Sequence, residues 1–366
     1  MTPPHPSMER KRIAGFDVAR ALAVLGMTVV HFNLVMTDGA TPRRWSAVMM
    51  SLLDGRPAAL FMMLAGMGMS LLAAKADTAG GPAKTDAMLR RRGLLLLLFG
   101  FLNLMIWEGD ILRVYGVSLL AAPWLLRRSA RTLLTGAGCF AALFCLLFLL
   151  LDYSRNWNWS AMKYHGLWTV SGAVRNLFFD GFRAVFPWTG LLILGLWLGR
   201  LDWSRPGVAR TAVWAGLGTA AATALASGLL LGWTERSPQP GLDRESAVAL
   251  FGLLSMPPLP LFLFNAGGCA LAVTGASVLA AERWRESLPV RALAATGRMA
   301  FTWYIAHIVL GLGGVVALGW TESTPGQALA AAGVFLLAAM AVSLWWTGRF
   351  AQGPLEFLLR AAGGGR

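Results

Sequence analysis

The sequence contains few charged residues, and this scarcity excludes an ordinary soluble domain. Only 14% of its 366 residues are Asp, Glu, Lys or Arg, whereas 56% are hydrophobic. A typical soluble domain carries about 25% charged residues. Most of the surface of such a chain must face a medium other than water, and the composition indicates that this medium is a lipid bilayer.

Cysteines and short catalytic motifs are also scarce. Cys139, Cys145 and Cys269 all lie within apolar runs, so the sequence indicates no external disulfide and no metal site. There is no P-loop, no dinucleotide-binding fingerprint and no HExxH, and the glycines of "TAGGPAK" around Lys84 lack the P-loop spacing. Because these motifs are missing, the sequence gives no support to a nucleotide-hydrolysing, dinucleotide-dependent or zinc-dependent enzyme.

The apolar residues are gathered in runs of roughly 17–25 residues, the length at which a helix crosses about 30 Å of hydrocarbon. We predict ten transmembrane helices, because helices are the workable spanning form for such runs. Their bounds are about 14–36, 57–74, 93–107, 111–126, 132–151, 184–199, 211–233, 256–280, 299–318 and 327–347. The third, fourth and sixth are short, so their boundaries are loose.

No change in composition marks a separate soluble domain. We therefore predict an all-α polytopic integral membrane protein in which residues 1–366 form a single domain. It has a cytoplasmic tail at 1–12, spans within 13–347 and a cytoplasmic C-terminal segment at 348–366.

The net charge of +14 and an isoelectric point near 11 would suggest nucleic-acid binding in a soluble protein. Here the distribution of the charges indicates topology instead. If the N-terminus is cytoplasmic and ten spans alternate, the cytoplasmic side holds 22 Lys and Arg with 8 acids, and the other side holds 10 of each. This is the asymmetry of the positive-inside rule. We predict cytoplasmic termini and no nucleic-acid partner.

Ionisable residues at membrane depth are informative, because each costs about 3 kcal/mol unless it is paired or hydrated. The first run is too long for a cleaved signal peptide and carries Asp17, Arg20, His31 and Asn33. Asp17 and Arg20 are three residues apart and can pair. His31 lies about 16 Å further along the helix, in the outer third of the membrane. It is either a packing histidine bonded to a carbonyl or a general base near pH 7.

The second predicted span begins with a charged pair. Asp54 and Arg56 stand just before Pro57, which suits the first turn of a helix. An acid at this point is favoured by the helix dipole, so helix capping explains Asp54 as well as a functional role does. Further along, Gly66 and Gly68 let another backbone or a thin ligand approach closely.

A short polar stretch, "WEGDILRVYG", lies between two apolar runs. Glu108 and Asp110 belong to the predicted outer turn, and Asp110 suits the N-cap of the fourth span. Arg113 and Tyr115 then fall in the first two turns of that helix. A plain hairpin needs only a glycine and a cap, so we favour the mouth of a polar pocket here over a simple turn.

The ninth predicted span also carries polar residues. Arg298 opens it at the cytoplasmic face, and His307 follows about 13 Å further in, near the middle of the membrane, with Tyr304 between them. As for His31, a packing histidine is the alternative to a functional one.

The polar groups of the early spans gather toward the outer leaflet, whereas several arginines gather at the cytoplasmic mouth. These arginines are Arg91, Arg92, Arg200 and Arg298. An anionic molecule can dock below while a polar acceptor docks above. The arrangement suits either a transporter or an enzyme that works across the bilayer.

Several stretches of this chain resemble the YeiB-like membrane proteins (domain of unknown function 418). That family is related to heparan-α-glucosaminide N-acetyltransferase within the transmembrane acyltransferase superfamily. The resemblance covers nearly the whole chain and follows, in order, "DVARALAVLGM", "DGRPAALFMMLAGMGMSL", "RRRGLLLLLFGFLN", "GDILRVYG", "GLLILGLWLGR", "GRMAFTWYIAH" and "GPLEFLLR".

The resemblance implies a multi-pass enzyme of the bacterial cytoplasmic (inner) membrane. Such an enzyme takes an acyl group, usually acetyl, from cytoplasmic acyl-CoA and passes it to an amine or hydroxyl at the far side, often on a sugar or cell-surface glycan. The resemblance also implies a catalytic histidine shortly before an Asp that precedes the second span. Asp54 matches this Asp, and His31, which lies 23 residues earlier within the first span, is the candidate histidine.

From this resemblance we expect His31 to deprotonate the acceptor, with Asp54 or Asp110 orienting it. The residues expected to bind the acceptor are Asn33, Arg56, Glu108, Arg113 and Tyr115. Those expected to bind acetyl-CoA or another acyl-CoA, the arginines through its phosphates, are Arg91, Arg92, Arg298, Tyr304 and His307. The outer segment 152–183, which includes Trp157, Trp159, His165, Trp168 and Arg183, is expected to cover the acceptor.

Two alternatives stay open on the residues alone. A transporter or flippase for a lipid-linked sugar or small anion would use the same polar cavity. Against it, we find no inverted repeat and only one Pro-rich break, "SMPPLPLF" at 255–262. The other alternative is a membrane scaffold without activity. A monomer and a homodimer are equally compatible with the sequence.

Overall fold

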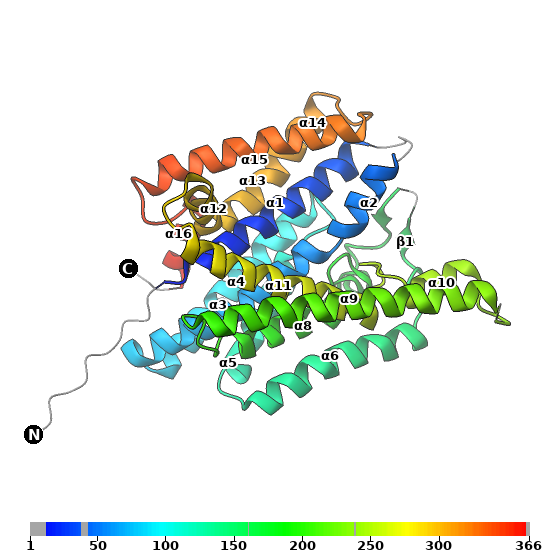
Figure 1. Cartoon of the computed structure of the whole chain (residues 1–366), viewed down its shortest axis with the longest axis horizontal. Coiled ribbons are helices and arrows are strands. Elements are labelled where there is room, and N and C mark those ends of the chain that lie inside the picture. Colours follow the sequence, from blue (N-terminus) through cyan, green and yellow to red (C-terminus); the bar gives the residue numbers. More distant parts are fainter. Residues whose placement is uncertain (1–11, 38–42, 160, 238, 364–366) are drawn as a thin grey trace, which may run out of the picture.

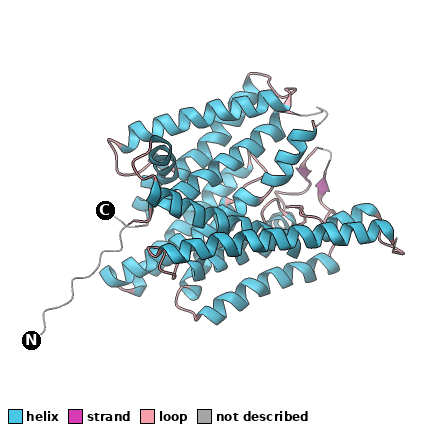
Figure 2. Ribbon diagram, viewed as in Figure 1, coloured by secondary structure: helices cyan, strands magenta, loops and turns pink. Residues whose placement is uncertain are grey.

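The computed structural model of the protein describes residues 12–37, 43–159, 161–237 and 239–363. Its long helices lie side by side in a single bundle, and their axes are roughly aligned (Figure 1). Within the described residues, the only strands are β1 (Trp157–Asn158) and β2 (Lys163–Tyr164), which form a short antiparallel hairpin (Figure 2). The protein is a helical polytopic membrane protein, as predicted.

The helices follow one another along the chain with mostly short connections. In the first half they are α1 (Ala14–Met36), α2 (Arg44–Leu53), α3 (Arg56–Gly80), α4 (Pro82–Leu104), α5 (Leu112–Leu125), α6 (Ala130–Leu150), α7 (Val170–Arg175) and the π-helix η1 (Asn176–Asp180). In the second half they are α8 (Val185–Leu198), α9 (Pro206–Arg236), α10 (Arg244–Phe251), α11 (Pro260–Arg283), α12 (Leu288–Arg298), α13 (Ala300–Ala306), the π-helix η2 (His307–Leu312), α14 (Gly313–Ala317), α15 (Pro325–Thr347) and α16 (Pro354–Ala362).

Seven helical segments in the described part of the chain are long and apolar enough to cross a membrane. They are Ala14–Met36, Arg44–Ala74, Ala130–Leu150, Pro206–Arg236, Pro260–Arg283, Ala300–Ala317 and Pro325–Thr347. An eighth is present if the bent pair Val170–Asp180 and Val185–Leu198 counts as one span. Seven of the ten predicted spans therefore coincide with full-length apolar helices.

The other three predicted spans, 93–107, 111–126 and 184–199, coincide with helices of short apolar length. Charged residues occupy the first half of α4, so its apolar part, 93–104, spans only about 18 Å. α5 and α8 have 14 residues each, about 21 Å, and α8 meets the preceding helical segment at a 47° bend. Hydropathy does not separate a short packed helix from a complete span, because both are apolar.

The bundle has two chemically different ends. Arg200, between α8 and α9, donates to the carbonyl oxygens of Leu126 and Arg128 at 2.8 Å each, and we call this side the basic end. On the opposite side, the Glu108 carboxylate accepts the backbone N–H of Tyr164 at 3.1 Å. This bond ties the α4–α5 turn to the hairpin, and we call this side the loop end. The basic end corresponds to the predicted cytoplasmic side.

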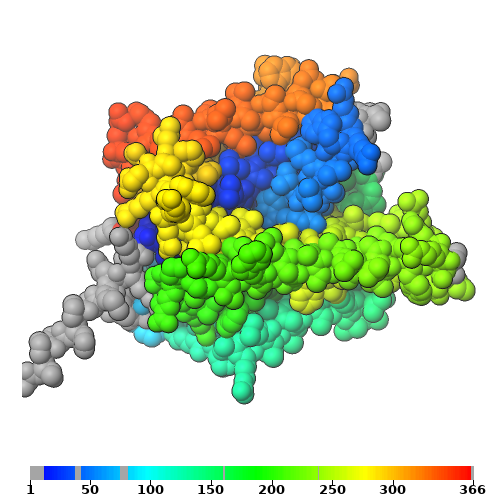
Figure 3. Space-filling model, viewed as in Figure 1, coloured from blue at the N-terminus to red at the C-terminus, as the bar shows by residue number. Residues whose placement is uncertain are grey.

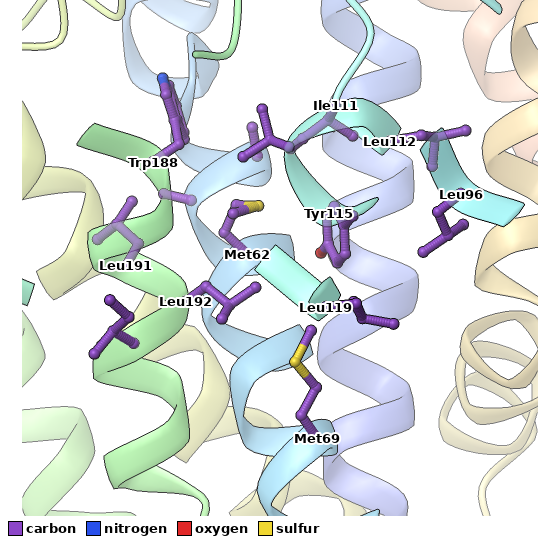
Figure 4. Packing of buried hydrophobic residues seen from close by; sticks show 14 of the residues in the cluster. Met62, Met69, Leu96, Ile111, Leu112, Tyr115, Leu119, Trp188, Leu191 and Leu192 are labelled. Carbon is purple, nitrogen blue, oxygen red and sulfur yellow. The ribbon is translucent and has the colours of Figure 1, made fainter. Parts of the chain in front are cut away.

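α3 forms the centre of the bundle and packs against α1, α4, α8 and α11. Figure 4 shows Met62 and Met69 of α3 between Leu192 of α8 and Leu119 of α5. The α3 and α8 backbones approach most closely at Gly66, where a Cβ would lie 2.0 Å from the Leu192 carbonyl oxygen. The small residues of α3 therefore admit a neighbouring backbone, the close packing that membrane helices rely on.

α9 lies across the outside of the bundle against α11 (Figure 3). At the contact, a Cβ on Gly216 would lie 2.5 Å from the Ala272 nitrogen. On its other side α9 exposes large apolar residues, among them Trp214, Leu225 and Leu229. An outward apolar surface of this kind is typical of a helix that faces lipid, since water does not favour it.

The loop end is organised around the buried carboxylate of Asp180. This carboxylate accepts from the Tyr164 hydroxyl at 2.7 Å and forms an ion pair with Arg175. The Asp180 carbonyl oxygen accepts the Trp157 indole N–H at 2.7 Å. These contacts join β1, β2 and α7 to the end of η1, so the chain is held in place where it turns back into the bundle at Arg183.

Candidate active site

α1 carries the candidate catalytic histidine and is held at the basic end by ion pairs. Asp17 accepts from Arg20 and from Arg12, at 2.7 Å in each case. The predicted pairing of Asp17 with Arg20 is confirmed, because three residues is the spacing that aligns two side chains on one helix face. His31 lies further along the same helix, toward the loop end.

His31 forms a pair with His307 in η2. Nδ1 of His31 and Nε2 of His307 are 2.9 Å apart, and Nδ1 of His307 lies 3.3 Å from the Trp303 carbonyl oxygen. The Trp107 ring lies 4.8 Å from the His31 ring, centroid to centroid. The sequence led us to assign the two histidines to separate roles, because the spacing within each helix does not determine how two helices are rotated toward each other.

A small cavity lies beside His31. Its volume is about 20 Å³, enough for about one water molecule. The walls come from α1, the start of α3, the α4–α5 turn, α13 and the connection before α8. They comprise the polar residues His31, Arg183 and Tyr304, the apolar residues Met27, Val30, Leu53, Pro57, Ala58, Ile111 and Phe182, and the glycines Gly55 and Gly109.

Arg183 supplies a positive charge to this cavity. Its guanidinium lies 4.6 Å above the Trp188 ring and donates to the Phe182 carbonyl oxygen at 2.6 Å. Within the described residues no carboxylate forms an ion pair with it, and the charge of Asp54 acts on it only at longer range. A buried guanidinium without a bonded acid is suited to bind an anion or a developing negative charge. Sequence reasoning included Arg183 only as part of the covering segment.

Tyr304 also lines the cavity. Its hydroxyl oxygen accepts the Ile111 N–H at 3.3 Å, so the hydroxyl proton points elsewhere and can be donated. Its ring lies nearly parallel to Phe61, at 6.4 Å and 19°. The residue predicted to contact CoA therefore lies next to His31, away from the basic end.

Asp54 has a different partner from the predicted one. Its carboxylate accepts from the backbone N–H of Ser255 at 3.3 Å and from the Ser255 hydroxyl at 2.8 Å. α3 begins after Gly55, which has a φ of +68° and provides no side-chain cap. Of the two interpretations of Asp54, helix capping is wrong, because the turn at Gly55 directs the carboxylate to the 252–259 connection.

Asp110 and Arg113 form a closed cluster away from the cavity. They are 0% and 1% exposed and 3.4 Å apart. Asp110 accepts the Arg113 backbone N–H and the Asn103 amide, each at 3.0 Å, and Arg113 donates to Asn176 at 3.0 Å. Asp110 therefore caps the start of α5, as predicted. Neither residue is among the cavity walls or bonds to His31 in the described structure.

Of three other residues expected to hold the acceptor, two bond to protein groups. Tyr115 donates to the Phe61 carbonyl oxygen at 2.6 Å, and Arg56 donates to Asn265 at 3.0 Å. The Asn33 side-chain oxygen is buried and has no hydrogen-bond partner within the described structure. None of the three lines the cavity.

A larger groove opens at the loop end, on the other side of the α4–α5 turn. Its volume is about 550 Å³. Glu108 lines this groove, and the next residue, Gly109, lines the cavity. Burial raises the pKa of the Glu108 carboxyl, although the Tyr164 N–H partly offsets the effect. The other walls are Leu104, Met105, Ile106, Tyr164, His165, Gly166, Leu167, Trp168 and Thr169.

The arginines predicted to bind CoA lie at the basic end. The Nε atoms of Arg92 and Arg298 are buried and, among the described residues, have no hydrogen-bond partner. Arg298 donates through Nη2 to the Ala351 carbonyl oxygen at 3.0 Å, and Arg91 is exposed. The expected CoA-binding set is thus divided, with Tyr304 at the cavity, His307 bonded to His31 and the arginines at the other end.

Glu356 of α16 links the C-terminal segment to the helix that leads to His307. It accepts the backbone N–H groups of Phe301 and Thr302 at 2.7 and 3.1 Å, and also the Thr302 hydroxyl. These bonds satisfy the start of α13 after the break at Met299. Glu356 is the one acidic residue of the motif "GPLEFLLR". Sequence reasoning quoted this motif but assigned no role to the glutamate.

Comparison with known proteins supports this description of a membrane enzyme. The catalytic family of heparan-alpha-glucosaminide N-acetyltransferase matches residues 12–229, and the protein family of unknown function DUF418 matches residues 195–365. The uncharacterized protein YxaH of Bacillus subtilis (strain 168) is 25% identical, over 98% of this chain and 95% of that protein. No solved structure matches.

The first match covers more than half of the chain and indicates membrane acetyltransferase chemistry in general. The two matches together extend from residue 12 to residue 365 and carry the motifs quoted above. The chain therefore belongs to the catalytic family of heparan-alpha-glucosaminide N-acetyltransferase, and its second half carries the DUF418 match of the YeiB-like proteins that it was predicted to resemble.

Proposed function

We propose that the protein is a membrane-embedded acyltransferase that moves an acyl group, with acetyl as the first candidate, from cytoplasmic acyl-CoA to a sugar-like acceptor. The acceptor would offer an amine or a hydroxyl at the opposite face of the membrane. The observation that carries the proposal is the cavity where His31, Arg183 and Tyr304 meet. The match to the heparan-alpha-glucosaminide N-acetyltransferase catalytic family supports an acetyl donor and an amino-sugar acceptor.

In the proposed reaction the acceptor nitrogen or oxygen attacks the thioester carbonyl carbon while His31 takes its proton. The new bond forms and the carbonyl electrons move to the oxygen, where Arg183 and Tyr304 stabilise the negative charge. The carbonyl then re-forms and the carbon–sulfur bond breaks. His31 returns the proton to the departing CoA thiolate, so protons and electrons balance without any further reactant.

The acceptor would bind largely in the groove at the loop end. The cavity, at about 20 Å³, has room for one water-sized group such as the attacking amine or hydroxyl, whereas the 550 Å³ groove accommodates a sugar. Glu108 offers a carboxylate for an amine or hydroxyl, and the exposed Trp168 offers a flat apolar surface for a sugar ring. The α4–α5 turn borders both hollows, since Glu108 lines the groove and Gly109 lines the cavity.

The donor would enter from the basic end. CoA carries several phosphate charges, and arginine binds phosphate through paired N–H groups. The buried Nε atoms of Arg92 and Arg298 lack protein partners in the described structure, and this unmet bonding capacity favours these two arginines for the role. Exposed Arg91 would add long-range attraction, which weakens as salt is added.

The test uses the full chain in lipid nanodiscs with acetyl-CoA labelled in the acetyl group. Release of free CoA and transfer of label to a pool of amino sugars and glycans are followed for the wild type, His31→Ala and Leu34→Ala. We expect His31→Ala to lose about 10²-fold or more in turnover. Leu34, on the same helix, is 40% exposed, so its truncation should leave turnover unchanged.

Two outcomes would overturn the proposal. Equal turnover in His31→Ala and the wild type would exclude His31 as the base. Failure of the wild type to bind or consume acetyl-CoA and longer acyl-CoAs would exclude the acyltransferase and favour the transporter alternative.

A further inference from the structure

His31 and His307 meet edge to edge. The ring centroids of His31 and His307 are 5.1 Å apart and their planes are inclined by 22°. The nitrogen–nitrogen distance is much shorter, at 2.9 Å. The two nitrogens therefore point at each other within a nearly common plane, which is the geometry of a hydrogen bond and not of face-to-face stacking.

The carbonyl oxygen of Trp303 determines where the protons lie. It can only accept, so Nδ1 of His307, which is 3.3 Å away, must carry a hydrogen. A neutral imidazole has one N–H, so Nε2 of His307 is then an acceptor. Nδ1 of His31 must donate to it. The lone pair of His31 is therefore on Nε2, and His31 is the member of the pair that lines the cavity.

We propose that His307 is a positioning residue that holds His31 as the Nδ1–H tautomer and turns its basic Nε2 toward the cavity. The chain of donors runs from His31 through His307 to the Trp303 carbonyl oxygen. The catalytic consequence rests on the function proposed above, whereas the tautomer itself does not. The role differs from the contact with the CoA arm that was expected for His307.

The local backbone supports this arrangement. His307 is the first residue of η2, and π-helical turns of this kind are frequent at functional sites. The Trp303 carbonyl oxygen accepts both the backbone N–H of His307 and its ring, and a carbonyl has two lone pairs for this purpose. At Gly311 a Cβ would lie 2.9 Å from the Phe32 ring, so this glycine lets η2 approach α1 closely.

The neutral partner has a chemical consequence. When Nε2 of His31 takes the acceptor's proton, its Nδ1–H bond to His307 becomes charge-assisted and stronger. His307 neither gains nor loses a proton in this step. The proton therefore stays on Nε2 of His31, next to the cavity, where the departing CoA thiolate can receive it.

The first test reads the tautomers directly. The chain has four histidines, so nitrogen-15 NMR of the histidine-labelled protein in nanodiscs gives few signals, and His5→Gln and His165→Gln assign two of them. We expect both His31 and His307 to be protonated at Nδ1. In His307→Phe, which keeps a ring but removes the acceptor, we expect His31 to move toward the Nε2–H form. An Nε2–H signal for His31 in the wild type would overturn the proposal, and so would an unchanged signal in His307→Phe.

The second test uses turnover and rescue. We expect His307→Phe to lower kcat on the order of 10³-fold, because the wrong tautomer presents an N–H where a base is needed. KM for acetyl-CoA should stay within about twofold. His307→Gln offers an amide oxygen to His31, so it should restore the Nδ1–H signal and at least tenfold of the lost kcat. Full turnover in His307→Phe, or no recovery with a well-folded His307→Gln, would exclude the positioning role.

The two experiments separate this inference from the proposed function. If the expected tautomers are found but the wild type transfers no acyl group, the hydrogen-bonded chain stands and the acyltransferase falls. If the wild type transfers acyl groups and His307→Phe does so equally well, the acyltransferase stands and the positioning role falls.

Discussion

Two arginines buried near the loop end have opposite surroundings. Arg113 is 1% exposed and pairs with Asp110, and Asn176 binds its Nη2. Arg183 is 9% exposed, lies over the Trp188 ring and lines a cavity. The charge of Arg113 is balanced by Asp110, although its Nε and Nη1 have no hydrogen-bond partner in the described structure. The guanidinium of Arg183 instead faces a space that a reacting group can occupy.

The difference separates a structural polar cluster from a functional one. A charge inside a membrane protein must be compensated, and the Asp110–Arg113 pair does this locally, at the start of α5. Around Arg183 the described structure offers a carbonyl oxygen, two aromatic faces and the charge of Asp54, but no carboxylate that forms an ion pair with it. We infer that the first cluster holds the fold and the second is kept for chemistry.

The largest expected effect follows from breaking the closed cluster. Asp110→Ala leaves the buried Arg113 guanidinium without a counter-charge, which costs about 3–5 kcal/mol of unfolding free energy. Asp86→Ala removes one partner of the exposed pair with Arg127 and should cost less than about 1 kcal/mol. Unfolding of both variants in mixed detergent micelles measures the difference.

A further variant tests the reason for this loss. Arg113→Met in the Asp110→Ala background removes the unpaired charge and should recover most of the stability. If Asp110→Ala costs no more than Asp86→Ala, the cluster is not what holds α5 in place. If Asp110→Ala unfolds normally yet loses turnover, Asp110 belongs to the chemistry after all.

The next largest effect follows from removing the open charge. Arg183→Gln should lower kcat by roughly 10²–10³-fold, because one donor to the developing negative charge is lost. Its unfolding free energy should change little, since no acid is left unpaired. Arg244, the first residue of α10, has a side chain that is 87% exposed. Arg244→Gln is therefore the matched control and should keep full turnover. Unchanged kcat in Arg183→Gln would remove Arg183 from the mechanism.

Features that depend on spacing within one helix could be predicted from the sequence. The Asp17–Arg20 pair follows from a separation of three residues, and the cap that Asp110 gives to α5 follows from its place before an apolar run. The helical fold follows in the same way, because long apolar runs have few alternatives in lipid.

Contacts between distant parts of the chain could not be predicted. His31 and His307 are 276 residues apart, and Asp54 and Ser255 are 201 apart. Both contacts depend on how packed helices are rotated and translated relative to each other, which hydropathy does not encode. For the same reason the residues of "WEGDILRVYG" looked like one site, although the structure divides them between the closed cluster, the cavity and the groove.

The smallest expected effect concerns Glu108 at the edge of the groove. The pH dependence of stability tests whether this carboxyl, like Arg183, is kept partly dehydrated for a ligand. Burial raises the pKa of this carboxyl above its ordinary 4.5, so the folded protein favours the neutral form. The stabilising contribution is complete below pH 4.5 and is lost as pH rises through the higher pKa of the folded state. Glu108→Gln keeps an oxygen for the Tyr164 N–H but cannot ionise. We therefore expect the wild type to lose stability relative to Glu108→Gln as pH rises from 4.5 to 7.

Asp243, at the start of α10, provides a control of opposite sign. It is solvent-exposed, and its bond from the Ser246 N–H lowers the pKa of its carboxyl below the ordinary 3.8. Its contribution is therefore present above the ordinary value and lost as pH falls through the lower pKa. Melting curves in nanodiscs from pH 3 to 7 should thus show the wild type losing stability relative to Glu108→Gln, and gaining it relative to Asp243→Asn, as pH rises. If the melting temperatures of the wild type and Glu108→Gln change with pH in parallel, Glu108 is as well hydrated as Asp243. The groove would then lack the partly dehydrated carboxylate that was proposed to bind the acceptor.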